Sequence, residues 1–164
     1  MPETAFLITT FATLFVVIDP PGLVPLFIAL TQGMDPAHRR RLALRACVIA
    51  FGILLVFGIA GDTILGFVGI SMPAFRIAGG ILLFLTALDM LFERRTQRCE
   101  GQKAEHDHDP SVFPLATPLI AGPGAIASVI LLVGQSGSGW GGMVAVLALV
   151  ALMLVVTFLF LLAS

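Results

Sequence analysis

Charged residues are scarce in this chain of 164 residues: they make up 12% of the composition, while 58% of the residues are hydrophobic. A soluble domain has about one-quarter charged residues, so the composition argues against one. The mean hydropathy is +1.04, and the clustering of the charges leaves apolar runs long enough to cross a bilayer as α-helices. The sequence therefore predicts an all-α, polytopic transmembrane helical bundle in a lipid bilayer.

Other absences exclude further classes of protein. The net charge of −1 gives no reason to expect nucleic acid as a partner. Cys47 falls in an apolar stretch and Cys99 in a charged one, so unpaired thiols are expected rather than a disulfide. The phosphate loop, the nucleophile elbow and the zinc-protease motif are all missing. The chain is therefore not expected to be an enzyme or to hold a cofactor or metal, and transport would be driven by a gradient or by another subunit.

Five spans and one charged segment organise the chain. The predicted spans cover residues 5–31, 43–63, 72–92, 112–134 and 143–163. Residues 1–92 form a first half, 93–111 a cytoplasmic charged linker and 112–164 a second half. Eight of the nine Lys and Arg residues fall at the junction of spans one and two or between spans three and four. The positive-inside rule places those connections in the cytoplasm and the N-terminus outside. The linker's His-Asp-His-Asp run at 106–109 is expected to be a solvated loop rather than a metal site.

Two of the spans are interrupted at mid-length, by the sequences DPPG at 19–22 and AGPG at 121–124. An offset of 102 residues superposes Pro21 on Pro123 and Gly22 on Gly124. Because the breaks lie in spans one and four, an odd number of spans apart, the two broken segments cross in opposite directions, which predicts the inverted-topology halves of many secondary transporters. A chance match or simple helix kinking is the alternative. The repeat also calls for a partner of span three near residue 174, so a sixth span is expected to be absent from these residues, with truncation or a degenerate gene favoured over a natural five-span design.

Asp19 is the leading candidate for a functional side chain, because an ionisable group at membrane depth is costly and is a functional hypothesis by default. The helix that starts after the first break is expected to offer free N–H groups to an anion. The alternative is that Asp19 only caps that helix. Arg76, near the start of span three, is read either as a partner for Asp19 or a substrate carboxylate, or as a side chain that snorkels to the interface.

The second break carries no charge, so backbone groups would act there, and a packing-only kink is the alternative. Hydroxyl groups elsewhere in the spans are expected to hydrogen-bond to their own helices. The residues concerned are Thr86, Thr117 and Ser128.

Three ordered motifs resemble the MarC family of integral membrane proteins. They are DPPGLVPLF at 19–27, PAFRIAGGILLF at 73–84 and FPLATPLIAGPGAI at 113–126, supported by ALDML at 87–91. The resemblance implies a bacterial or archaeal inner-membrane protein, normally of six spans, grouped loosely with LysE-like exporters. Some similar proteins are described as transporters of small neutral amino acids. This chain departs from that pattern in the missing sixth span, which leaves its own activity open.

The sequence thus predicts a secondary transporter of a small molecule such as a neutral amino acid, coupled to a proton or a sodium ion. A homo-oligomer is compatible with the sequence. The predicted substrate-binding residues are Asp19, Pro20, Pro21, Gly22, Arg76, Gly122, Pro123 and Gly124. One alternative is a non-transporting membrane protein, either an assembly partner or a truncated remnant. The other is an intramembrane enzyme that acts on lipid, although only Asp19 lies at depth.

Overall fold

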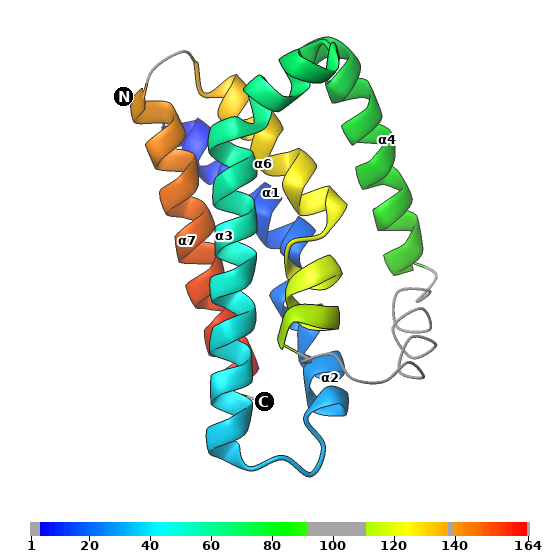
Figure 1. Ribbon diagram of the computed structural model, residues 1–164, viewed down its shortest axis with the longest axis vertical. Helices are drawn as coiled ribbons and strands as arrows, with labels where there is room; N and C mark the ends of the chain where they lie inside the picture. Colours follow the sequence, from blue (N-terminus) through cyan, green and yellow to red (C-terminus); the bar gives the residue numbers. More distant parts are fainter. Residues whose placement is uncertain (1–3, 92–110, 138–139, 164) are drawn as a thin grey trace.

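Every regular element in the part of the chain that the structure describes is a helix. The structure is a computed structural model that describes residues 4–91, 111–137 and 140–163. It contains six α-helices and one π-helical segment within those residues (Figure 1). In chain order these are α1 (Thr4–Ile18), α2 (Pro20–Leu30), α3 (Pro36–Val68), α4 (Met72–Leu91), η2 (Ser111–Ile120), α6 (Pro123–Gln135) and α7 (Trp140–Leu162).

The architecture is a polytopic helical membrane bundle, as the composition predicts. Among the described residues, three helical stretches are long and apolar enough to cross a membrane: Thr4–Leu30, Pro36–Val68 and Trp140–Leu162. Two shorter apolar helices cover Met72–Leu88 and Pro123–Gln135. These five apolar segments correspond in order to the five predicted spans. Most of the predicted linker, with its His-Asp-His-Asp run, lies outside the described residues.

α3 begins and ends where its local sequence dictates. The Asp35 carboxylate accepts a hydrogen bond from the Ala37 N–H at 3.2 Å, and Pro36 occupies the first helical position, where its missing donor costs nothing. At the other end Gly69 adopts φ 78°, and the Ile70 N–H donates to the Leu65 carbonyl at 2.9 Å. This left-handed glycine cap closes the helix. α3 therefore runs beyond the predicted span 43–63 at both ends.

α3 and α7 pack along each other and form one side of the bundle (Figure 1). Both contact α6, α1 contacts α6 and α7, and α4 contacts α6. A Cβ at Gly58 of α3 would lie 2.8 Å from Leu147 Cδ2 and 3.2 Å from Val129 Cγ1. Glycine at this position lets α3 approach α7 and α6 closely, which is how membrane helices gain van der Waals contact.

The outer surface of α7 is as apolar as its buried face. Val150 and Met153 are fully buried, whereas Val155 and Leu159 are more than half exposed. A helix that is hydrophobic on all sides is suited to contact lipid on the side that faces away from its neighbours. The exposed apolar side chains of α7 are therefore expected to face the hydrocarbon of the bilayer.

Arg39 links α2 to the start of α3. Its guanidinium carbon lies 5.6 Å from the centroid of the buried Phe27 ring, within the range of a cation–π contact. We expect Arg39→Gln to lower the free energy of unfolding by about 0.5–1 kcal/mol. The neighbouring exposed Arg40, changed to Gln, is the matched control and should leave stability unchanged in detergent. Equal stability of the two variants would contradict this assignment.

Candidate functional site at the two helix breaks

The first break is a single residue in a left-handed conformation. Asp19 has φ 52° and ψ 64°, and it is the one non-glycine residue with positive φ in the described part of the chain. Its N–H still donates to the Phe15 carbonyl at 2.9 Å, so the helical ladder of α1 continues to this point. Aspartate is among the few residues that tolerate this region. The chain then restarts as α2 at Pro20.

Asp19 caps α2, in agreement with the simpler of the two sequence interpretations. Its Oδ1 accepts a hydrogen bond from the Gly22 N–H at 3.2 Å. A side chain at position 22 would collide with this carboxylate, because a Cβ there would overlap Oδ2 and lie 2.7 Å from Cγ. Glycine is therefore required at position 22 if the Asp19 carboxylate is to remain over the helix start.

The expectation that α2 offers free N–H groups to an anion is wrong. Pro20 and Pro21 have no N–H, and the Gly22 N–H is already bonded to Asp19. Every donor in the first turn of α2 is therefore absent or used. The start of this helix cannot hold a carboxylate through its backbone.

Instead, the first break presents hydrogen-bond acceptors. In a continuous helix the N–H groups of residues 20 and 21 would donate to the carbonyls of Val16 and Val17. Because both positions are proline, these two carbonyls lose their helical donors. The half-buried Asp19 carboxylate lies next to them in the chain. Two carbonyls and a carboxylate make this a suitable environment for a cation.

The second break presents hydrogen-bond donors. The π-helical η2 ends with the Ala121 N–H bonded to the Ala116 carbonyl at 2.8 Å, and Gly122 then caps α6 without a side-chain hydrogen bond. Pro123 has no N–H, so the N–H groups of the first turn belong to Gly124 and Ala125. Both residues are buried. Uncapped N–H groups at the positive end of a helix dipole form an environment suited to an anion.

The two breaks meet at Gly124. A Cβ at this position would lie 3.6 Å from Val17 Cγ1 of α1, 3.4 Å from Leu83 Cδ2 and 3.8 Å from Thr86 Oγ1 of α4. Val17 is one of the residues whose carbonyl is released at the first break. The acceptor-rich break of α1 and the donor-rich start of α6 therefore lie against each other, with α4 beside them.

A groove of about 420 Å³ runs between α1 and α4 next to this junction. Its volume lies within the range of small-molecule sites. The Thr86 hydroxyl donates to the Leu82 carbonyl of its own helix at 2.9 Å, as predicted for an intramembrane hydroxyl. The lining residues are Ala12, Thr13, Val16, Val17, Leu83, Thr86 and Ala87.

Arg76 does not join this junction. It lies on α4 seven residues before Leu83, about 10 Å along the helix axis, and its side chain is exposed. The neighbouring turns of α4 contact the far part of α6, because Met72 lies against Gly134 and Gly79 against Leu131. A role for Arg76 in the site therefore remains a prediction of the sequence.

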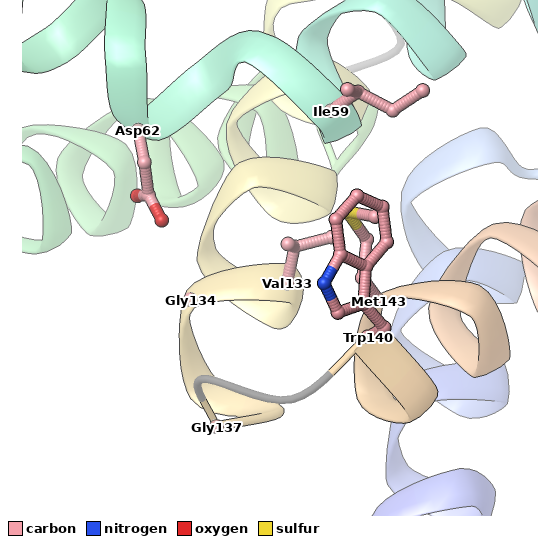
Figure 2. Close-up of a pocket in the computed structure, with 7 residues that line it drawn as sticks. All are labelled: Ile59, Asp62, Val133, Gly134, Gly137, Trp140 and Met143. Carbon is pink, nitrogen blue, oxygen red and sulfur yellow. The ribbon is translucent and has the colours of Figure 1, made fainter.

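A second hollow, of about 480 Å³, lies at the end of the bundle where α6 is joined to α7. Figure 2 shows the indole of Trp140 near Val133, with the Asp62 carboxylate apart from it on the other side of α6 in this view. Trp140 is 81% exposed, and Asp62 is exposed as well. Tryptophan is typical of the membrane–water interface. These residues therefore fit an interfacial surface better than a midplane site.

The residues on both sides of the junction lie within a stretch of the chain that matches a known protein family. The chain matches the description "MarC family integral membrane protein" over residues 4–164. It belongs to the MarC family. The resemblance predicted from the motifs is thereby confirmed.

Several members of the MarC family are similar to most of this chain. A UPF0056 membrane protein of Archaeoglobus fulgidus is 43% identical over 81% of the chain, and the match spans 64% of that relative. One from Methanocaldococcus jannaschii is 38% identical over 99% of the chain and 80% of its own length. The UPF0056 inner membrane protein YhgN of Escherichia coli is 35% identical over 87% of the chain and 72% of its own length. No solved structure matches the chain.

Sequence reasoning located both breaks in this MarC family member and predicted that backbone groups act at the second one. It was wrong in placing free N–H groups at the start of α2. Val16 and Val17 give no polar signal in the sequence, because their contribution is a backbone carbonyl. The only signal was the pair of prolines four residues later. Leu83 and Thr86 of α4 also went unnoticed as neighbours of Gly124, since only helix packing brings them there.

Proposed function

We propose that this MarC family member is a secondary transporter of small zwitterions, such as neutral amino acids, in a bacterial or archaeal inner membrane. The observation that carries the proposal is the complementary chemistry of the two breaks. The first has acceptors and a carboxylate, the second has backbone donors, and Val17 contacts the position of Gly124 between them. A zwitterion is the simplest solute that satisfies both.

The ammonium group would bind at the first break. Asp19 supplies the charge, and the carbonyls of Val16 and Val17 supply acceptors that have no helical donor. A charge-assisted hydrogen bond is about twice as strong as a neutral one. The same oxygen atoms suit a coupling proton or sodium ion, because oxygen ligands suit hard cations.

The carboxylate of the solute would bind at the second break, to the N–H groups of Gly124 and Ala125. Here the dipole of the 13-residue α6 favours negative charge. Leu83 and Thr86 stand close to Gly124, so the room for a substrate side chain is limited on the side of α4. The proposal therefore favours small neutral amino acids over bulky ones.

Alternating access would come from movement of the two broken segments relative to each other. The 102-residue offset and the opposite directions of α1 and α6 in Figure 1 support inverted halves around the junction. The transported solute would be exposed alternately at the N-terminal end of the bundle, predicted to lie outside, and at the other end. The absence of nucleotide motifs in the sequence supports coupling to a gradient.

The test is the thermal stability of the purified protein against glycine, alanine, serine and leucine, with ethylamine and propionate as controls that carry one charge each. We expect small zwitterions to raise the melting temperature, following RT ln(1 + [L]/Kd) as concentration rises. Ethylamine carries only the ammonium group and propionate only the carboxylate, so each can bind at one break only. Both should change the melting temperature little. Equal shifts for all solutes, or none, would contradict the proposal and favour a non-transporting membrane protein.

A further inference from the structure

Two hydroxyl groups in the described residues are buried without any hydrogen-bond partner. Thr10 of α1 is 0% exposed and Ser128 of α6 is 2% exposed, and neither side-chain oxygen has a partner. The prediction that Ser128 bonds to its own helix is therefore wrong. In contrast, Thr157 of α7 donates to the carbonyl four residues earlier at 2.9 Å. The hydroxyls of Thr10 and Ser128 do not make this usual hydrogen bond to a carbonyl of their own helix.

Both hydroxyls lie on the stripes by which α1 and α6 face each other. Thr10 precedes Val17 by seven residues, which is two turns, so the two side chains share one face of α1. Ser128 follows Gly124 by four residues on the corresponding face of α6. Val17 contacts the position of Gly124, which fixes these faces against each other.

The two hydroxyls also lie at similar heights in the bundle. α1 and α6 run in opposite directions (Figure 1). At 1.5 Å per residue, Thr10 is about 10 Å and Ser128 about 6 Å from the Val17–Gly124 contact, both towards the N-terminal end of α1. They therefore occupy the part of the α1–α6 interface that separates the two breaks from that end of the bundle.

An apolar side chain would stabilise this closed interface better than a hydroxyl does. Leaving a buried hydroxyl unsatisfied costs about 1–3 kcal/mol, and a valine or alanine in the same place carries no such cost. The hydroxyls gain partners when the two helices separate and water or a polar solute enters. Buried polar groups without a hydrogen-bond partner are rare in native structures, so each one needs an explanation. Separation of the two helices during function is one.

We propose that Thr10 and Ser128 line the passage from the N-terminal end of the bundle to the two breaks. When α1 and α6 separate, their hydroxyls bond to water and to the ammonium and carboxylate groups of a passing small zwitterion. This inference rests on the proposed transport function and adds the route by which the solute reaches its site. It also makes the α1–α6 interface the barrier that closes the route.

Thiol labelling tests the route without any knowledge of the substrate. Thr10→Cys and Ser128→Cys are made in a full-length background with Cys47→Ala and Cys99→Ser, and reconstituted vesicles are treated with a small charged methanethiosulfonate. Both thiols should react, since separation of α1 and α6 exposes them. Leu54→Cys of α3 and Val150→Cys of α7, at positions that are also 0% exposed, are the matched controls and should stay unreactive.

Labelling of Thr10→Cys and Ser128→Cys that is as slow as in the two controls would overturn the inference. It would mean that the α1–α6 interface stays closed and that its hydroxyls are satisfied in some other way. Reactive thiols in a protein that binds and transports no zwitterion would overturn the proposed function instead. Inert thiols in an active transporter would overturn the route alone.

A second pair of variants keeps the inference testable if a cysteine disturbs folding. Thr10→Val and Ser128→Ala remove the unpaired hydroxyls, and both should raise the melting temperature while slowing transport. Thr10→Ser keeps the hydroxyl and should restore the transport rate. A lower melting temperature with unchanged transport in both variants would show that the hydroxyls are structural, and would contradict the inference.

Discussion

Gly124→Leu is expected to abolish transport and to lower the free energy of unfolding by about 1–3 kcal/mol, the usual cost of overpacking. α1, α4 and α6 converge on this glycine, and a Cβ would lie 3.4–3.8 Å from its three nearest neighbours. Those distances leave room for one methyl group and for little more. A leucine side chain would have to push α1 or α4 away and would cover the N–H groups proposed to bind a carboxylate.

Two matched variants separate the local effect from a general one. Gly124→Ala adds only the Cβ, at ordinary van der Waals distance, and should keep most of the transport activity. Gly52→Leu places leucine on the exposed face of α3, where nothing lies within 4 Å of a Cβ, and should leave transport and stability unchanged. Transport by Gly124→Leu at the wild-type rate would contradict the placement of the site at this junction.

Asp19→Asn is expected to abolish transport while leaving stability nearly unchanged. Asparagine keeps an oxygen that can accept the hydrogen bond from the Gly22 N–H, and it is as good a helix cap as aspartate. It also tolerates the left-handed conformation of this residue. The one property removed is the negative charge, which the proposed function assigns to the ammonium group of the solute or to a coupling ion.

Asp19→Ala removes both the cap and the charge, so it should abolish transport and also lower the free energy of unfolding by about 0.5–2 kcal/mol. Another N-cap aspartate in the described residues provides the control. Asp35 caps α3 through the Ala37 N–H at 3.2 Å and lies outside both breaks. Asp35→Ala should lower stability by a similar amount and keep transport. Wild-type transport by Asp19→Asn would show that Asp19 acts only as a cap.

The positions of the membrane segments could be predicted from the sequence because they depend on composition along the chain. Apolar runs of 20 residues or more leave few alternatives to a helix. The positions of the two breaks could also be predicted from the sequence, since proline removes a backbone hydrogen-bond donor wherever it lies. α1 ends at Ile18, immediately before the first predicted interruption, and α6 begins at Pro123, within the second.

The donors left free at the first break could not be predicted, because they depend on side-chain geometry. The sequence suggested free donors at the start of α2, but the Asp19 carboxylate turns back onto the Gly22 N–H and takes the one donor present. The same is true of Ser128, whose hydroxyl could have bonded within its helix and does not. Both outcomes follow from rotamers and helix packing, which a linear pattern does not encode.

The position of Arg76 relative to the breaks also depends on helix packing. The sequence left open whether Arg76 pairs with Asp19 or a substrate carboxylate or snorkels to the interface. The register of α4 against α6 decides which turn of α4 meets the breaks. Met72 lies against Gly134, so the turn that reaches Gly124 is the one with Leu83 and Thr86. A one-turn slide of α4 would have given a different set of neighbours.

The most direct test of the account is counterflow of labelled alanine into vesicles preloaded with unlabelled alanine, compared for the wild type, Asp19→Asn and Asp35→Asn. The account predicts uptake by the wild type and by Asp35→Asn, and none by Asp19→Asn, with all three proteins equally stable. Equal uptake by Asp19→Asn and the wild type, or uptake by none of them across the panel of small zwitterions, would contradict it.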